Sequence, residues 1–294
     1  MLIVRNHHHI DDPGHDDFGG LHRDLAATGQ ALGRRRLLKL AGGLGAAFGA
    51  LQLAGCGSNP NAPSDSTTTT TGSTGTGGTG GTGSTSLCTA KVPEETAGPY
   101  PGDGSNGPNV LPLTGVLRSD IRSSFAGLSG TADGIPLVVQ LTIVSASTCA
   151  PLAGRAVYIW HCDRAGRYSL YTAGATSQNY LRGVQEADAN GRVTFTSIFP
   201  ACYAGRWPHI HFEVYPTLTA AQSVSNKIAT SQIALPKAQC DEVYATSGYE
   251  QSVRNLSQIS LASDMVFADG ASLELATTMG SVSMGYTAAL TVAV

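Results

Sequence analysis

The sequence has few charged side chains and no basic stripe. Its 294 residues include 18 Lys and Arg against 21 Asp and Glu, which gives a formal net charge of −3. Because nucleic-acid binding depends on clustered positive charge, this composition argues against a nucleic-acid partner. It also gives no reason to expect a strongly charged substrate.

Long apolar runs are also missing. The run at 40–55 is shorter than the roughly 20 residues that cross a bilayer. It follows the basic cluster RRRLLK at 34–39, a pattern typical of an export signal, and the leading arginines indicate the twin-arginine type. The sequence LAGC at 53–56 is typical of a lipobox and predicts a lipid on Cys56. An ordinary cleaved signal with an incidental cysteine is the alternative.

Apolar residues are absent altogether from Ser66 to Ser86, where every residue is Ser, Thr or Gly. Such a segment cannot bury a core and is expected to be a flexible coil. We therefore divide the chain into a signal with a His-rich leader (1–56), a flexible tether (57–87) and a catalytic-domain candidate (88–294). We expect export and lipid anchoring at the cell envelope, on the periplasmic or outer face, and leave a homodimer open.

The cysteines lack CxxC spacing, which argues against a zinc site built from cysteine. Disulfides are permitted outside the cytoplasm, and the odd number of cysteines after Cys56 leaves at least one thiol free. Cys88 and Cys149 lie at segment edges and could pair, but the sequence leaves the pairing open. The five cysteines after Cys56 are Cys88, Cys149, Cys162, Cys202 and Cys240.

Helical periodicity is almost absent from the rest of the chain. Short runs rich in Val, Ile, Thr and aromatic residues recur between turn signals, which predicts an all-β fold, a β-sandwich of short, mostly antiparallel strands with long active-site loops. Short helical turns are expected at 218–223 and 237–244. The predicted strands are 137–144, 156–160, 192–198, 209–215, 227–235, 264–268, 272–277 and 286–294.

Of eight histidines, only three follow the predicted signal, and two of these form one HxH motif, His209 and His211. On a strand, side chains at i and i+2 project from the same face, so both imidazoles can reach one metal ion. Tyr203 lies six residues before His209, and Tyr168 lies in a loop one predicted strand upstream. The third histidine, His161, is expected to pack at a strand end.

Two tyrosines and two histidines form an unusual set of candidate metal ligands. A free tyrosine titrates near pH 10, so a phenolate at neutral pH needs a strong positive charge nearby. Hard anionic oxygens favour a hard, highly charged ion, and we therefore expect iron(III). An exported zinc- or copper-binding protein is an alternative, and it predicts that metal is retained when both tyrosines are replaced.

Five segments of the chain carry a resemblance to a known family: PEETAGPY (93–100), LRSDIR (117–122), WHCDRAGRYS (160–169), RVTFTSIFPACYAGRWPHIHF (192–212) and TSQ (230–232). Together they resemble the intradiol ring-cleavage dioxygenases, the family of catechol 1,2-dioxygenase and protocatechuate 3,4-dioxygenase. The export signal and tether resemble the exported, single-subunit branch. The loop between Tyr203 and His209 is shorter than in the well-known enzymes, so specificity for ring substituents cannot be carried over.

The resemblance implies one iron(III) per domain, held by Tyr168, Tyr203, His209 and His211. Tyr203 and His211 would be axial ligands, and Tyr168 and His209 equatorial ones. Tyr203 would also be catalytic, as the ligand that a catechol displaces when it binds the iron through both oxygens.

The resemblance also implies roles for three further residues. Arg206 would be catalytic and substrate-binding, stabilising charge on the activated ring. Gln232 and Tyr100 would line the substrate pocket. The implied reaction inserts O2 between the two hydroxylated carbons of a small aromatic diol and gives a muconate-type diacid. A transthyretin-like β-sandwich that binds partners without chemistry is the alternative, and Trp207 could either wall the pocket or cap the sheet.

Overall fold

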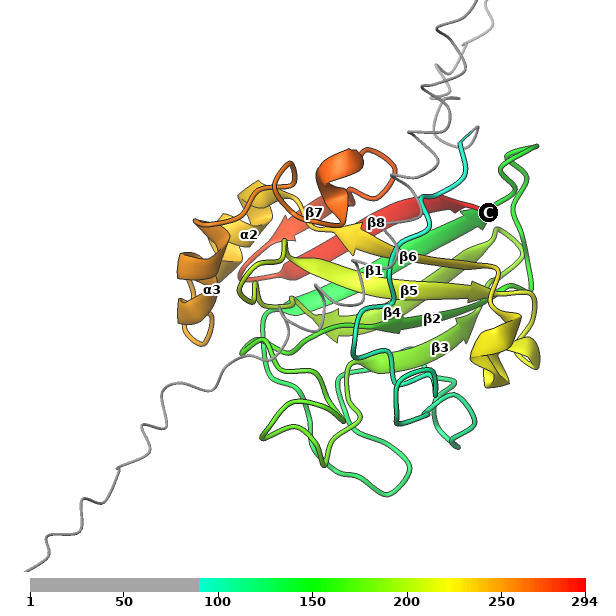
Figure 1. Ribbon diagram of the computed structural model, residues 1–294, viewed down its shortest axis with the longest axis horizontal. Coiled ribbons are helices and arrows are strands. Elements are labelled where there is room, and N and C mark those ends of the chain that lie inside the picture. Colours follow the sequence, from blue (N-terminus) through cyan, green and yellow to red (C-terminus); the bar gives the residue numbers. More distant parts are fainter. Residues whose placement is uncertain (1–89) are drawn as a thin grey trace, which may run out of the picture. The chain divides into compact units, whose positions relative to one another are not determined.

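The computed structural model describes residues 90–294, which form two packed four-stranded sheets (Figure 1). The predicted signal and tether lie outside the described residues. Within 90–294, no helix is both long enough and apolar enough to span a bilayer. The predicted all-β sandwich is confirmed.

The first sheet has the strand order β4-β1-β8-β7. Its central pair, β1 and β8, is parallel, and the other two pairs are antiparallel. Strand β1 alternates between buried and less buried positions, as expected where one face packs on a core and the other meets solvent. The strands are β1 (Pro136–Val144), β4 (Arg192–Ile198), β7 (Thr277–Ser281) and β8 (Gly285–Ala293).

The second sheet has the order β3-β2-β5-β6 and is antiparallel throughout. Every residue of β2, β5 and β6 is buried, so this sheet is covered on both faces. One face meets the first sheet, and loops cover the other. The strands are β2 (Ala156–Trp160), β3 (Arg182–Glu186), β5 (His209–Tyr215) and β6 (Ala229–Ala234).

The apolar core lies between the sheets. Strand β1 contributes Leu137, Val139 and Leu141, and β5 contributes Ile210 and Phe212, each at most 1% exposed. Burying a side chain of this size contributes roughly 1.5–3 kcal/mol. Because neighbours on a strand face opposite ways, burial of Ile210 and Phe212 in this core turns His209 and His211 to the other face.

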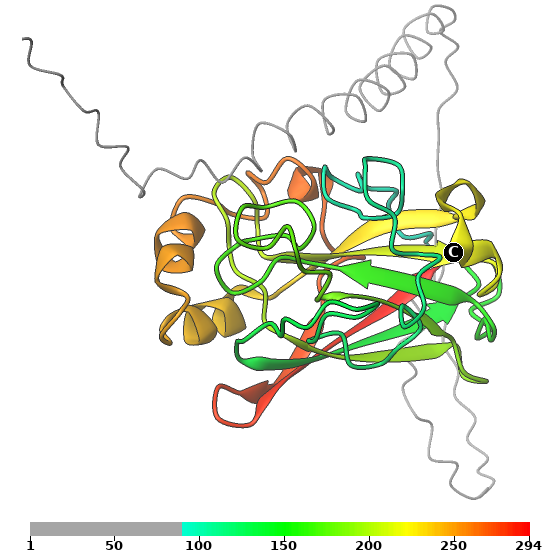
Figure 2. The same cartoon turned by 90° about the horizontal axis from the view of Figure 1, so that it is seen from below.

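Short helices flank the two ends of the sandwich (Figure 2). The α-helices lie at one end and the first two 3₁₀ helices at the other, in both views. The predicted helical turns at 218–223 and 237–244 correspond to η1 and α2. The helices are η1 (Ala220–Gln222), η2 (Val224–Asn226), α2 (Lys237–Tyr244), α3 (Glu250–Leu256) and η3 (Phe267–Asp269).

Two predicted strands are wrong. Residues 264–268 form a turn leading into η3, because the Asp264 carboxylate accepts from the N–H groups of Val266 and Phe267 and bends the backbone. Residues 272–277 also form a turn, and only the last of them enters β7. Strand β3 was not predicted, because its sequence RGVQE contains glycine and no apolar alternation.

Candidate metal centre

The outer face of the second sheet carries a row of four chemically distinct side chains, one from each strand. Arg182 pairs in register with Trp160, Trp160 with His211, and His211 with Gln232. The indole of Trp160 stacks on the imidazole of His211, with ring centroids 4.9 Å apart and planes 3° from parallel. This stacking fixes the plane of the imidazole.

Two loops bring the predicted tyrosines to the same place. Tyr168 comes from the connection between β2 and β3, and Tyr203 from the connection between β4 and β5. The Nε2 atom of His209 lies 3.4 Å from the Tyr168 hydroxyl, 3.3 Å from the Tyr203 hydroxyl and 3.1 Å from Nε2 of His211. All four side chains are buried, none more than 5% exposed.

The tautomer of His209 follows from its second ring nitrogen. Nδ1 lies 2.6 Å from the carbonyl oxygen of Trp207, and a carbonyl only accepts, so Nδ1 carries the proton. The lone pair is then on Nε2 and points into the cluster. Burial, together with the nearby Arg206 charge, lowers the pKa of His209 well below its usual value, so the imidazole is neutral at neutral pH.

The cluster fits a single metal ion. The single lone pair on His209 Nε2 cannot accept hydrogen bonds from all three of its polar neighbours at once. A metal ion between the four atoms would instead accept a lone pair from each of them. Donor atoms about 2.0–2.1 Å from one ion, at angles near 90–110°, lie about 2.8–3.4 Å apart, and the three contacts fall within this range. Within residues 90–294, no three His, Cys, Asp or Glu side chains group in a metal-binding arrangement, so a centre here requires the phenols.

The Tyr168 loop is shaped by Asp163. Its Oδ1 accepts from the backbone N–H groups of Ala165 and Arg167, at 2.9 and 3.0 Å, which closes a tight turn just before the tyrosine. Gly166, inside that turn, has a φ of 82°, a conformation that favours glycine. The GRY sequence is thus a consequence of the turn that presents Tyr168.

Arg206 is fully buried beside the cluster. Its Nε donates to Oδ2 of Asp264 at 3.0 Å, and its Nη2 donates to the side-chain oxygen of Gln232 at 2.7 Å. The amide nitrogen of Gln232 in turn donates to the Thr96 carbonyl at 2.9 Å. The structure therefore brings Arg206 and Gln232 together and ties both to the segment around Thr96.

That segment, residues 92–101, crosses the outer face of the second sheet (Figure 1). It is joined to β6 through the N–H of Glu95, which donates to the Thr230 carbonyl. Further along, the ring of Tyr100 lies 5.0 Å from the ring of Tyr168 and 5.2 Å from that of Tyr171. Tyr100 thus lies directly against a candidate ligand, at the place where the sequence predicts a pocket wall.

Arg182 is a residue that sequence reasoning missed. It is 1% exposed, and its guanidinium donates to the carbonyls of Tyr100, Pro101 and Ser169 and to the hydroxyls of Tyr158 and Ser169. It therefore fastens both the crossing segment and the Tyr168 loop to the sheet. No sequence signal distinguishes this arginine from one on an exposed edge strand.

Two other predicted residues lie outside the cluster. His161 is buried, with Nε2 2.7 Å from the Ser197 hydroxyl and Nδ1 2.8 Å from the Cys162 carbonyl. It thus links the two sheets, which agrees with a packing role. Trp207 belongs to the core between the sheets and donates from Nε1 to the Leu235 carbonyl, so it caps the sheet instead of forming a pocket wall.

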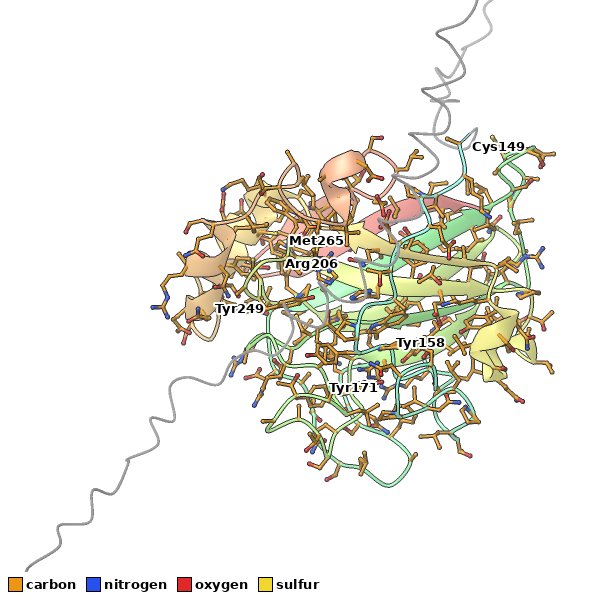
Figure 3. The ribbon with its side chains drawn as sticks, viewed as in Figure 1. Cys149, Tyr158, Tyr171, Arg206, Tyr249 and Met265 are labelled. Carbon is orange, nitrogen blue, oxygen red and sulfur yellow. The ribbon has the colours of Figure 1, made fainter. Side chains whose placement is uncertain are left out.

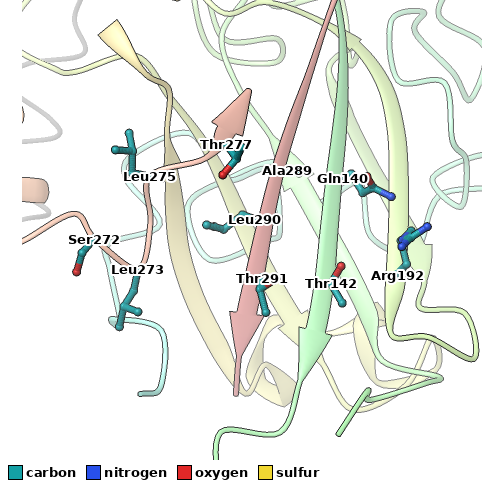
Figure 4. Close-up of a pocket in the computed structure, with 10 residues that line it drawn as sticks. All are labelled: Gln140, Thr142, Arg192, Ser272, Leu273, Leu275, Thr277, Ala289, Leu290 and Thr291. Atoms are coloured by element: carbon teal, nitrogen blue, oxygen red, sulfur yellow. The ribbon is translucent and has the colours of Figure 1, made fainter. Parts of the chain in front are cut away.

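The cysteines also lie outside the cluster. Cys149 is disulfide-bonded, and the three free cysteines among the described residues, Cys162, Cys202 and Cys240, are buried. Cys88 lies outside the described residues. A groove of about 220 Å³, lined in part by Gln140, lies on the outer face of the first sheet (Figure 4). It is therefore on a different sheet from the cluster.

The geometry agrees with comparisons to known proteins. A family model described as dioxygenase matches residues 107–213, which include Tyr168, Tyr203, Arg206 and the HxH motif. The structure of an intradiol ring-cleavage dioxygenase from Tetranychus urticae is similar, with 26% identity and a TM-score of 0.55, covering 69% of this chain and 94% of that one. A second dioxygenase crystal structure has 26% identity and a TM-score of 0.54, covering 69% and 93%. No curated protein matches.

Fold and family match together define an enzyme of the dioxygenase class. More narrowly, residues 107–213 match the dioxygenase family model, and the fold is similar to that of an intradiol ring-cleavage dioxygenase. A transthyretin-like module without chemistry is therefore disfavoured. Tyr100, Gln232 and Asp264 lie outside the matched residues 107–213, so their roles depend on contacts alone.

Proposed function

We propose that this protein is a non-haem iron(III) dioxygenase that cleaves a catechol-type diol between its two hydroxylated carbons. Tyr168, Tyr203, His209 and His211 would hold the ion. The observation that carries the proposal is the convergence of two phenol oxygens and His211 Nε2 on the lone pair of His209 Nε2, at 3.1–3.4 Å.

The donor set favours iron(III). Two phenols supply hard oxygen ligands that become anionic only beside a strong positive charge, which favours iron(III) over zinc(II) or copper(I). When bound, iron(III) would act as a Lewis acid that the diol chelates through both oxygens, and it would make the ring reactive towards O2. The two buried, neutral imidazoles would add no charge, so the phenolates would balance most of the charge of the ion.

The protein's own groups have separate tasks. Tyr203 would leave the ion and accept a proton from the incoming diol at its phenolate oxygen. Arg206 would stabilise negative charge on the ring from its buried position beside His209. Tyr168 and the two histidines would remain in place, held by the Asp163 turn, by Trp160 stacking and by the Trp207 carbonyl.

The aromatic surroundings suit a planar substrate. The ring of Tyr100 lies against those of Tyr168 and Tyr171, and Trp160 covers His211. Rings of this kind stack favourably on an aromatic diol, and the burial of Tyr100, Tyr168 and Trp160 keeps bulk water away from the reacting atoms. We therefore propose Tyr100 and Gln232 as residues that line the substrate pocket.

Ring cleavage by the iron-loaded protein tests the proposal. Incubation with catechol and O2 should consume one O2 per catechol and give a diacid with both oxygen atoms incorporated, measurable with ¹⁸O2 and mass spectrometry. Tyr203→Phe and His209→Ala should each abolish the product. Tyr249→Phe is the matched control, because it removes a buried hydroxyl that bonds only to backbone at Phe199 and Ile135, and it should retain activity.

Two results would contradict the proposal. Product formation that persists in Tyr203→Phe would remove this tyrosine from the reaction. Zinc or copper retained with full occupancy after replacement of both Tyr168 and Tyr203 by Phe would favour an exported zinc- or copper-binding protein instead.

We also propose that the chain is exported and anchored by a lipid on Cys56, on the basis of the sequence at 34–56. Replacing Cys56 by Ser should move the protein from the membrane fraction to the soluble fraction. Replacing the first two arginines of RRRLLK by Lys should block export. A Cys56→Ser protein that stays in the membrane fraction would contradict lipid anchoring.

A further inference from the structure

The carboxylate of Asp264 contacts the guanidinium of Arg206. It is fully buried, as is Arg206, and the two form an ion pair of 3.0 Å between Oδ2 and Nε. A second, longer contact of 3.5 Å joins Oδ1 to Nη2. A two-atom contact of this kind orients a guanidinium as well as balancing its charge.

Asp264 is itself held rigidly. Oδ1 accepts from the N–H groups of Val266 and Phe267, at 2.8 and 3.2 Å, in the turn that leads into η3. The backbone N–H of Asp264 donates to the Ser260 carbonyl at 2.8 Å. A carboxylate fixed by its own turn can position a partner, whereas a side chain on a mobile stem cannot.

The same carboxylate contacts the backbone of the loop between Tyr203 and His209. Oδ2 accepts from the N–H of Trp207 at 2.6 Å. The carbonyl of Trp207 is the group that fixes the tautomer of His209. Asp264 is therefore connected to the cluster twice, through the Arg206 side chain and through Trp207.

In Figure 3, Arg206 and Met265, the residue after Asp264, are labelled side by side where the C-terminal segment meets the second sheet. Arg206 is thus held from two directions, by Asp264 on that segment and by Gln232 on β6. Gln232 is in turn bound to Thr96 of the crossing segment. These contacts leave the guanidinium one orientation relative to Tyr203 and His209.

We propose that Asp264 is a positioning residue for ring cleavage, which fixes the Arg206 guanidinium beside the cluster and holds Trp207 against His209. The proposal rests on the proposed function. It assigns a role in the reaction to a C-terminal segment outside residues 107–213, which the family model matches. Asp264 acts through Arg206 and Trp207 and does not touch the substrate.

The test compares Asp264→Asn and Asp264→Glu with the wild-type protein. Asp264→Asn removes the charge and keeps a similar shape, whereas Asp264→Glu keeps the charge and displaces the carboxylate by one methylene. Glu274→Gln is the matched control, because Glu274 is also fully buried in the C-terminal segment but binds Ser231, whose side chain faces away from that of Gln232. Should Asp264→Asn fail to accumulate, Asp264→Glu decides the question.

Four quantities separate positioning from mere structure: iron per chain, the unfolding temperature of the metal-free protein, the anaerobic dissociation constant for catechol, and kcat per bound iron. We expect kcat per iron to fall about 10²-fold in both Asp264 variants, the scale of a small displacement of a catalytic group. The catechol dissociation constant should change by less than about threefold, because Arg206 acts on charge that develops during the reaction. Glu274→Gln should keep its kcat.

A double variant sharpens the result. Asp264→Asn keeps a side-chain oxygen that can accept from the Trp207 N–H, so its effect should pass through Arg206. Added to Arg206→Gln, it should therefore lower kcat by less than about threefold further. The proposal would be overturned if the losses of kcat in Asp264→Asn and Arg206→Gln multiply in the double variant. It would also be overturned if kcat per iron is unchanged in Asp264→Glu, or if Glu274→Gln loses as much kcat as the Asp264 variants. A wild-type protein that cleaves no catechol would instead overturn the proposed function, and the positioning role with it.

Discussion

The two sheets share a core, but their outer faces differ in how far they are buried. The outer face of the first sheet is open, with Arg192 and Thr291 exposed and a groove beside Gln140 (Figure 4). The outer face of the second sheet is buried although it carries His209, His211, Glu213 and Gln232. Polar side chains are costly to bury unless they are hydrogen-bonded or bind a ligand, so the buried polar face indicates the functional side of this sandwich.

Loss of one candidate ligand should have the largest effect. His211→Ala should abolish ring cleavage and lower iron affinity by more than about 10²-fold, because even groups that only orient metal ligands are worth about 10–100-fold. Iron content by elemental analysis and O2 uptake measure both effects. Thr291→Ala, on the open face, is the control, and a similar loss there would show that the two faces do not differ in function.

The second comparison uses two arginines on strands. Arg182→Met leaves carbonyls and hydroxyls of the Tyr168 loop and the crossing segment without their donor, and should cost about 3–5 kcal/mol of unfolding free energy. Arg192→Met, on the open sheet, should change it by no more than about 0.5 kcal/mol. Denaturant unfolding of both variants measures the difference. Equal losses would mean that Arg182 does not fasten the covered face.

The third prediction concerns the link between the sheets. Burial lowers the pKa of His161 to about 4 from an ordinary value of 6.5, so the folded protein resists a proton that the unfolded chain accepts. Stability from this group is therefore present above pH 6.5 and is lost as the pH falls towards 4.

His161→Gln should reduce this acid sensitivity. Between pH 7 and pH 5, the metal-free wild-type protein should lose about 2 kcal/mol more unfolding free energy than the variant does. Denaturant unfolding at the two pH values tests the difference. An identical pH dependence in both proteins would show that His161 takes up its proton in the folded state.

Strands with regular β-branched patterns could be predicted from sequence. The strands β1, β2, β4 and β5 follow from Val, Ile and Thr runs, and the period of a strand alone places both imidazoles of the HxH motif on one face of β5. The convergence of Tyr168 with Tyr203 could be expected only from the family resemblance, because loop conformation depends on contacts such as the Asp163 turn.

The contacts that sequence reasoning missed are all long-range. Arg182 bonds to residues about 80 positions earlier in the chain, and Asp264 bonds to Arg206 58 positions away. Neither lies in a local pattern that distinguishes it from an exposed residue. Asp264 even lies at the start of a predicted strand, because local propensity at 264–268 favours β structure and the side-chain turn overrides it.

The visible absorption spectrum of the iron-loaded protein, before and after anaerobic addition of catechol, tests the central claim most directly. Iron(III) bound by Tyr168 and Tyr203 predicts a broad tyrosinate-to-iron charge-transfer band that shifts when catechol binds. A protein that binds iron and stays colourless, or whose band is unchanged by catechol, would contradict a tyrosine-ligated centre open to a diol.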